Sequence, residues 1–114
     1  MSDIRETAAA SRQASRILAA TSGAQRTATL HAIAKGLRDN SAKIIAANKL
    51  DLDAGKDAGL EPSFMDRLML NEDRVEAMAV AVEEIAAQTD PIGSADSSIV
   101  LPNGLRVTRD RIPR

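Results

Sequence analysis

Apolar residues recur every three or four positions up to Asp90, as they do on the buried face of an α-helix. This spacing predicts five helices, over residues 3–20, 23–40, 42–58, 62–68 and from 72 until Asp90-Pro91 stops the last one. The pattern is most regular in the fifth, where one face carries Val75, Met78, Ala79, Val82, Ile85 and Ala86. Beyond Pro91 the period changes to two, which is typical of strands. The chain is therefore predicted to be mainly α-helical, with a β-hairpin at its C-terminal end.

Capping residues mark the expected helix boundaries. Ser22 and Gln25 have the spacing of a capping box, in which each side chain bonds the other residue's backbone amide. Asn71 is expected to cap the fifth helix. Asn40 and Gly59 are expected to end the second and third helices, because both residue types tolerate the left-handed conformation that closes a helix.

The third helix is expected to begin at a Ser41 cap and carries one polar residue, Asn48, on its apolar stripe. The stripe otherwise consists of Ile44, Ile45, Leu52 and Gly55. The fourth helix is short, and Pro62 suits its first turn because the missing N–H would have no intrahelical acceptor there.

The strands of the predicted hairpin, which covers about residues 98–112, read "IVL" (99–101) and "LRVTRDRI" (105–112), and residues 94–98 are expected to be a loop. Asn103-Gly104 between them is a strong turn signal, because both residue types accept positive φ. Pro102 has no N–H to donate opposite Leu105, so a looser turn than the two-residue type is expected. A lone hairpin is barely stable in water, and we expect this one to dock on further protein.

Composition changes the expected packing. Hydrophobic residues make up 44% of the 114 positions, but 21 of them are alanine and Phe64 is the only aromatic residue. Alanine favours helix yet buries little area, so each helix gains little free energy when it packs. A single domain at most, of marginal stability on its own and suited to close packing against more protein, is the expectation.

Charge and cysteine content exclude several classes of function. The formal net charge of -1 gives no overall field that would attract nucleic acid or an anionic membrane. No apolar run is long enough for a membrane span, and the first residues do not follow the basic-then-apolar order of a secretory signal, so a cytoplasmic chain is expected. The lack of cysteine excludes disulfides, thiolate metal sites and a cysteine nucleophile within this sequence.

Candidate metal and catalytic residues are few. His31 is the only histidine, and without cysteine or a second histidine it cannot complete a usual zinc set. Asp51, Asp53 and Asp57 lack the glycine and closing glutamate of a calcium loop, and a solvated helix face is expected instead. A separate enzyme working from His31 and these aspartates is disfavoured, since no base, nucleophile and stabilising group can be assigned together.

The remaining charged residues are also expected to be solvated. Glu83 and Glu84 are placed on the polar side of the fifth helix as solubility residues. The last segment carries four arginines offset by Asp110, which favours a protected edge strand or pairing with a partner's carboxylates: Arg106, Arg109, Arg111 and Arg114. Nucleic-acid binding is disfavoured because stacking aromatic residues are missing. The scattered glycines give no phosphate-binding loop.

Several short strings occur in an order that resembles one enzyme family. They are "ANKLDL" (47–52), "AGL" (58–60), "MDRLML" (65–70), "DPIG" (90–93) and "GLRVTRDRIPR" (104–114). No single string is specific, but the colinear set resembles the N-terminal part of γ-glutamyl phosphate reductase, also called glutamate-5-semialdehyde dehydrogenase. The resemblance extends over essentially the whole chain.

This resemblance implies an aldehyde-dehydrogenase-like α/β fold and a role in proline biosynthesis. Members of the family use NADPH to reduce L-glutamyl 5-phosphate to glutamate 5-semialdehyde and phosphate, through a cysteine thiolate. That cysteine and the glycine-rich cofactor strands have no counterpart in these residues, so no catalytic, cofactor-binding or metal residue is carried over, and no cofactor is expected on this chain alone. Whether this chain is itself an enzyme is left open.

The resemblance also implies an organisation into two parts. Residues 1–91 form an Ala-rich helical segment that would pack on the NADPH-binding domain, and residues 92–114 form a loop and hairpin of the region through which subunits associate. The expected partner is the rest of the reductase polypeptide or another subunit, as a homo-oligomer when complete. The alternative is a non-catalytic truncated relative that acts as an oligomerisation or interaction module.

Overall fold

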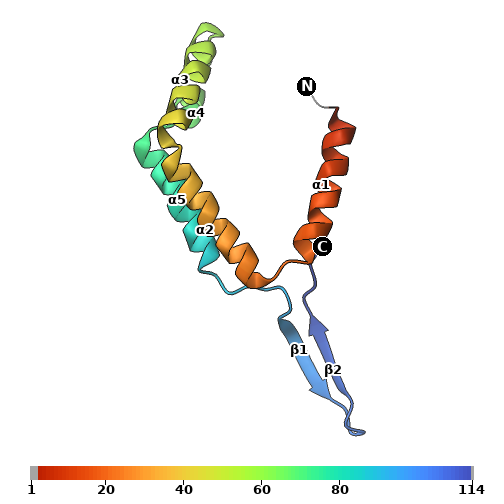
Figure 1. The fold of residues 1–114 in the computed structure, drawn as a ribbon. Coiled ribbons are helices and arrows are strands. Elements are labelled where there is room, and N and C mark those ends of the chain that lie inside the picture. The colour runs from red at the N-terminus through yellow and green to blue at the C-terminus, as the bar shows by residue number, and fades with distance from the viewer. Residues whose placement is uncertain (1–2, 114) are drawn as a thin grey trace. The chain divides into compact units, whose positions relative to one another are not determined.

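The computed structural model describes residues 3–113 and confirms a mainly helical chain with a C-terminal antiparallel hairpin (Figure 1). The elements are α1 (Ile4–Ala19), α2 (Gly23–Asp39), α3 (Ser41–Asp57), α4 (Pro62–Leu68), α5 (Glu72–Ala86), β1 (Ala95–Val100) and β2 (Arg106–Asp110). The chain forms two compact units. One consists of Met1–Arg26 together with Thr89–Arg114, and the other is Thr27–Gln88. We call the first the hairpin unit and the second the helical unit. None of the described helices is long and apolar enough to cross a membrane.

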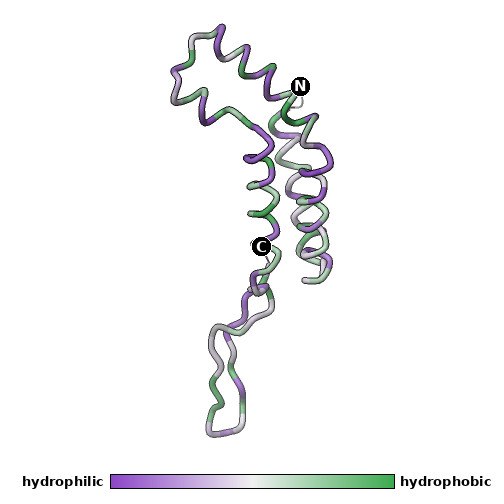
Figure 2. Tube along the Cα trace, turned by 90° about the vertical axis from the view of Figure 1, so that its left-hand side faces the viewer, coloured by the Kyte–Doolittle hydropathy of each residue, from purple (hydrophilic) through white to green (hydrophobic). Residues whose placement is uncertain are grey.

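The core of the helical unit is made of small side chains. Ala34 of α2, Gly55 of α3, and Val75 and Ala79 of α5 are buried. Small residues let helix backbones approach closely, and α3 contacts both α4 and α5. Each such residue removes little apolar area from water, so the core contributes less stabilisation than one built from Leu or Phe. Apolar residues recur along all the helices and both strands in Figure 2.

Asn48 is the one buried polar side chain among the described residues of this core, with 6% of its surface exposed. Its amide nitrogen donates to the carbonyl of Leu68 at 2.8 Å, and its Oδ1 accepts from the amide of Leu70 at 2.8 Å. The polar residue on the apolar stripe therefore ties α3 to the connection between α4 and α5. Burial is tolerated because both ends of the amide are bonded.

Most helix caps agree with the sequence. Gln25 N donates to Ser22 Oγ at 3.1 Å and Ser22 N to Gln25 Oε1 at 2.8 Å, which confirms the capping box. Asn71 caps α5 by accepting from Arg74 N at 2.8 Å. Gly59, at φ 76°, ends the α3 region, and its amide and that of the next residue bond carbonyls in the last turn. Pro62 lies in the first turn of α4 as expected.

Helix α2 ends at Asp39, where the sequence predicted its end, but not through the conformation expected of Asn40. Asn40 has φ −106° rather than a left-handed conformation, and its side-chain amide donates to the carbonyl of Gly36 at 2.8 Å. This bond satisfies the Gly36 carbonyl without a left-handed residue, and helix α3 begins immediately with Ser41. Ser41 is accordingly the first residue of α3 rather than its cap, and the Asn40 side chain makes no capping bond to α3.

Two further boundaries differ from expectation. Helix α5 ends at Ala86, a few residues before Asp90-Pro91, which was expected to stop it, through a tightened turn in which the amide of Gln88 donates to the carbonyl of Ile85 at 3.1 Å. A residue before proline is disfavoured in helical conformation, which already argues against a helix that reaches Asp90. Strand β1 begins at Ala95, within the segment expected to be a loop, because that segment pairs with β2 around an irregularity between Ala95 and Ser97.

The hairpin turn is looser than the two-residue type, as Pro102 required. Gly104 N donates to Leu101 O at 2.9 Å, and Leu101 N donates to Leu105 O at 2.7 Å. Gly104 has φ 86°, whereas Asn103 does not have positive φ, so the connection is a three-residue loop with glycine in the left-handed position. Asn103 Oδ1 accepts from Leu105 N at 3.0 Å and stabilises the loop.

Asn48→Ala is expected to destabilise the helical unit by about 2 kcal/mol, because it removes the partner of the Leu68 carbonyl and of the Leu70 amide in two partly buried hydrogen bonds. Urea unfolding of the chain, followed by far-ultraviolet circular dichroism, measures the change in free energy of unfolding. Lys49→Ala, at the exposed neighbouring position, is the matched control. Equal unfolding midpoints for the two variants would contradict the role given to Asn48.

Candidate functional site

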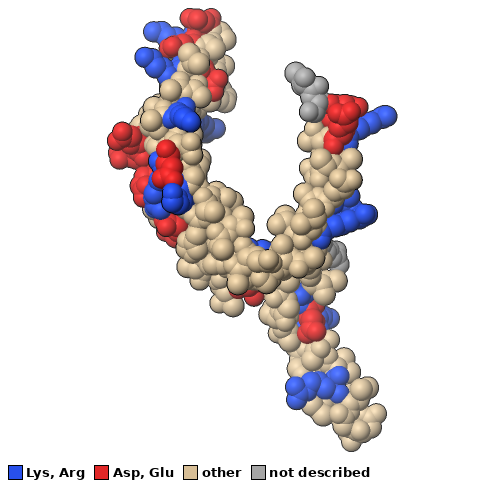
Figure 3. Space-filling model, in the orientation of Figure 1, with Lys and Arg blue, Asp and Glu red and all other residues tan. Residues whose placement is uncertain are grey.

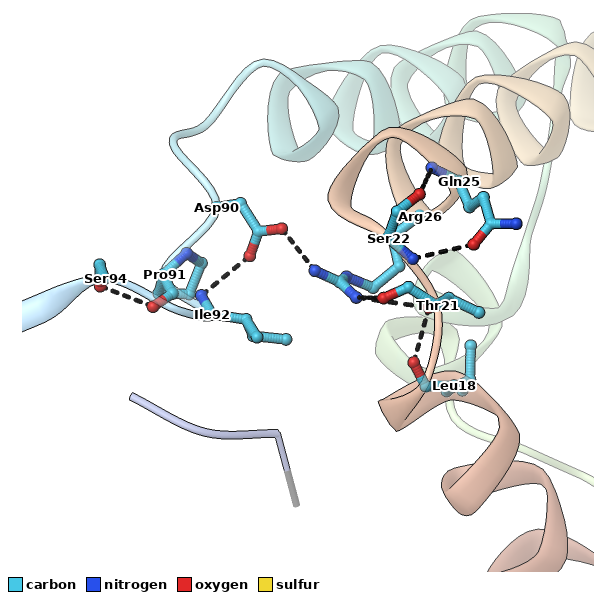
Figure 4. A network of polar contacts seen from close by, with 9 residues as sticks. All are labelled: Leu18, Thr21, Ser22, Gln25, Arg26, Asp90, Pro91, Ile92 and Ser94. Carbon is cyan, nitrogen blue, oxygen red and sulfur yellow. Dashed lines mark hydrogen bonds and ion pairs between the residues drawn. The ribbon is translucent and has the colours of Figure 1, made fainter. Parts of the chain in front are cut away.

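A polar junction joins the start of α2 to the segment that leads into β1 (Figure 4). Arg26 Nη2 contacts Asp90 Oδ2 at 2.6 Å, and Arg26 Nη1 donates to the carbonyl of Thr21 at 2.5 Å. The other Asp90 oxygen accepts from the amide of Ile92 at 2.9 Å. We call these residues, with Gly23, the Arg26–Asp90 junction. It links parts of the hairpin unit that are 64 residues apart in sequence.

The electrostatics of the junction favour an ionised aspartate. The hydrogen bond from Arg26 and then that from the Ile92 amide lower the pKa of Asp90. A Cβ added at Gly23 would lie 2.7 Å from Asp90 Oδ2, so the carboxylate occupies space beside the first residue of α2. The N-terminus of a helix carries partial positive charge, which adds to the attraction for this carboxylate.

A second charged cluster, the Arg38 clamp, connects α2 to α5 within the helical unit. The Arg38 guanidinium donates to both oxygens of Glu76, at 2.8 and 2.9 Å, and to Glu83 Oε1 at 2.6 Å. Hydrogen bonds from Arg38 lower the pKa of both glutamates, and nearby His31 adds a smaller contribution at Glu83. Glu83 is therefore part of a contact between helices, and its interpretation as a solubility residue was wrong.

Arg74 makes a third set of contacts, at the end of α4. Its guanidinium donates to the carbonyl of Met69 at 2.8 Å and to that of Asp66, and it forms an ion pair with the Asp66 carboxylate at 3.0 Å. Carbonyls at a helix C-terminus lack intrahelical donors, so a cation placed there is favourable. In Figure 3 acidic and basic side chains lie next to each other on the helical unit, in keeping with these pairs.

The predicted candidate residues do not come together into a chemical centre. His31 is exposed on α2, and Asp51, Asp53 and Asp57 are exposed on α3. Among residues 3–113 no group of three His, Cys, Asp or Glu side chains is placed to hold a metal ion. Sequence reasoning missed the roles of Arg26, Arg38 and Arg74. The carboxylate partners of Arg26 and Arg38 lie far away in the sequence, and no local pattern marks them.

The described residues do not fit the diphosphate of a nicotinamide cofactor. Glycines with positive φ lie at the end of α3 and in turns of the hairpin unit, and not between a strand and a helix N-terminus: Gly59, Gly93 and Gly104. Backbone amides at such a strand–helix junction are what cradles the phosphates of a dinucleotide. The start of α2 is next to the Asp90 carboxylate, which would repel an anion.

The β1–β2 hairpin presents its backbone and apolar side chains openly. Ile99 pairs with Val107, and their side chains remain 58% and 47% exposed. Because bonded and non-bonded pairs alternate in an antiparallel ladder, the bond from Leu101 to Leu105 places the amides of Val100 and Arg106 on the outer edges. Most of the hairpin surface visible in Figure 3 is uncharged.

Comparison with known proteins relates this chain to one group of enzymes. Over 102 residues the chain is 42% identical to "Gamma-glutamyl phosphate reductase" of Moorella thermoacetica, with 90% of this chain and 24% of that protein covered. Over 110 residues it is 41% identical to the protein of the same name from Leptospira interrogans, with 96% and 26% covered. The chain is homologous to the N-terminal part of γ-glutamyl phosphate reductase.

Solved γ-glutamyl phosphate reductases show the same fold for this segment. The Thermotoga maritima crystal structure matches 97% of this chain with a TM-score of 0.91 and 30% sequence identity. That of Saccharomyces cerevisiae matches 95% with a TM-score of 0.84 and 33% identity. The chain spans about a quarter of the length of the curated reductases that it matches. No protein-family model matches the chain.

The Arg38 clamp is expected to make the stability of the helical unit depend on pH. Because the pKa values of Glu76 and Glu83 are lowered in the folded state, their contribution is present above the unfolded value of 4.5 and is lost as pH falls through the folded values. Arg38→Gln removes the cause of this shift. When the pH is lowered from about 5 to about 3, the thermal unfolding midpoint of this variant is therefore expected to fall less than that of the unsubstituted chain.

Thermal unfolding followed by circular dichroism across this pH range measures the difference. Arg67→Gln, which removes the same charge from the exposed side of α4, serves as the matched control and is expected to keep the full pH dependence. An Arg38→Gln profile parallel to that of the unsubstituted chain would show that the clamp does not set the pH dependence.

Proposed function

We propose that this chain serves as the N-terminal segment of a cytoplasmic γ-glutamyl phosphate reductase of proline biosynthesis. The complete enzyme would transfer hydride from NADPH to the acyl carbon of L-glutamyl 5-phosphate, with cleavage of the bond to phosphate, and release L-glutamate 5-semialdehyde. The observation that carries the proposal is the continuous match of 90–96% of this chain to about a quarter of the curated reductases.

In this proposal the chain contributes structure rather than chemistry. Residues 1–91 pack on the NADPH-binding domain, and residues 92–114 lie in the region through which subunits associate as a homo-oligomer. Exposed large side chains support the first assignment, because an isolated unit would be expected to bury them: Ile33, Leu50, Phe64, Met78 and Ile85. The open edges of β1 and β2 support the second. The chain supplies no catalytic, cofactor-binding or metal residue.

An exchange of segments tests the proposal. This chain replaces the matching segment of the Thermotoga maritima reductase, and the rate of NADPH oxidation with L-glutamyl 5-phosphate is measured together with the oligomeric state. We expect a folded oligomer whose activity lies within about tenfold of the parent enzyme, because the exchange leaves the reacting groups of the parent unchanged. The same exchange into the Leptospira interrogans reductase changes fewer residues, because that protein is 41% identical to this chain, and it is the second chimera to be measured.

A chimera that assembles normally but lacks activity would contradict the proposal, and so would failure of both chimeras to assemble. The isolated chain provides a separate check. Titration with NADPH is expected to show no saturable binding to it, since the described residues lack a phosphate cradle. A discrete oligomer of the isolated chain in sedimentation, combined with inactive chimeras, would instead favour a non-catalytic interaction module.

A further inference from the structure

The junction brings the two sequence segments of the hairpin unit together through one carboxylate. Each Asp90 oxygen has a different partner, Arg26 on one side and the amide of Ile92 on the other. Arg26 in turn spans from Asp90 to the carbonyl of Thr21 in the α1–α2 turn. Its side chain is only 23% exposed, so solvent screens this ion pair less than it screens a fully exposed one.

Backbone bonds carry this attachment into the hairpin. The turn after Asp90 is closed by Ser94 Oγ, which donates to the carbonyl of Pro91 at 2.6 Å. Gly93 N donates to the carbonyl of Arg111 at 2.8 Å, and Arg111 N donates to the carbonyl of Ser94 at 2.9 Å. The base of the hairpin is therefore bonded directly to the turn that Asp90 fixes.

The absence of a side chain at Gly23 leaves room for the Asp90 carboxylate. At Gly23 any side chain would begin 2.7 Å from Asp90 Oδ2, which is closer than a Cβ atom can lie without displacement of the carboxylate. Gly23 is the first residue of α2, where helix-forming residues such as alanine would otherwise be favoured. Gly23, Arg26 and Asp90 thus lie together, and a side chain at the glycine would displace the carboxylate from its present position.

We propose that Arg26 and Asp90 act as a positioning pair, which holds the base of the β1–β2 hairpin on the start of α2 and so presents the hairpin edges to a second reductase subunit. The local attachment stands on the geometry of the junction. Its consequence for subunit association rests on the proposed function.

Hydrogen exchange of the chain tests the local attachment. Asp90→Asn keeps the shape of the side chain but removes its charge, and Gly23→Ala displaces it by contact. In both variants we expect amides of residues 92–95 and 109–112 to exchange about tenfold faster, with no change in α5, because only the base of the hairpin is released. Asp110→Asn, which removes a carboxylate from β2 of the same hairpin, is the matched control and is expected to change neither region.

Salt dependence separates a charged attachment from a purely structural one. Added salt weakens an ion pair that is partly open to solvent, so exchange at the hairpin base should rise with salt in the unsubstituted chain and not in Asp90→Asn. Equal exchange in Asp90→Asn and Asp110→Asn would overturn the proposal. Loss of protection throughout α5 in Asp90→Asn would overturn it as well, since the pair would then stabilise the whole chain.

The chimeric reductase tests the consequence for association. Asp90→Asn is expected to raise the subunit dissociation constant about tenfold in sedimentation, while the activity of each assembled subunit is unchanged, because the hairpin edges are less well placed. An active chimera whose association is insensitive to this substitution would overturn the positioning role. If the chimera is inactive while the base of the hairpin still opens in the variants, the proposed function fails and the local attachment stands.

Discussion

The small size of the buried side chains is the constraint on which the rest of this structure depends. Ala34, Gly55, Val75 and Ala79 let the helices approach closely, but they fill little volume and remove little apolar area from water. A core of this kind does not interlock strongly enough to select one helix register, since many alignments of small side chains pack about equally well. Specific polar contacts are then needed to distinguish the native arrangement from its neighbours.

Those polar contacts lie where one element must be fixed against another. Asn48 bonds both sides of the connection from α4 to α5, and Arg38 holds two glutamates that lie two turns apart on the same face of α5. Arg74 closes the end of α4, and Arg26 joins the start of α2 to the approach to β1. Each contact involves a planar group that bonds two partners at once, which fixes orientation as well as distance. Directional bonding therefore supplies specificity that the alanine-rich core lacks.

Local features of this fold could be predicted from sequence, and long-range ones could not. The Ser22–Gln25 capping box, the Asn71 cap and the closure at Gly59 involve residues within one turn of each other, so their spacing identifies them. Pro102 likewise excluded the tight turn. Asn48 was visible as an anomaly, a polar residue on an apolar stripe, although its partners were not.

The partners of Arg26 and Arg38 are 64 and at least 38 residues away, and charges of both signs occur throughout the chain. Nothing local distinguishes Glu83, which contacts Arg38, from its neighbour Glu84. Asn40 shows the opposite failure. Asparagine tolerates the left-handed conformation that closes a helix, but α3 begins immediately, and the Asn40 side chain donates to the Gly36 carbonyl instead. The colinear strings identified the family where the chemistry of single residues could not.

The sizes of the buried and exposed apolar side chains indicate how the exposed surface is used. Large apolar residues such as Phe64 and Ile85 are outside, at 56% and 52% exposure, while the buried apolar side chains of the described residues are the smaller Ala34, Val75 and Ala79. A chain that folded only for itself would gain free energy from the reverse placement, since a buried aromatic or aliphatic side chain contributes far more than a buried methyl group. Such an inversion is expected of a segment whose large side chains pack against the rest of a bigger enzyme. In the enzyme that we propose, small residues would bring the helices of the segment together, and large residues would attach them to the rest of the polypeptide.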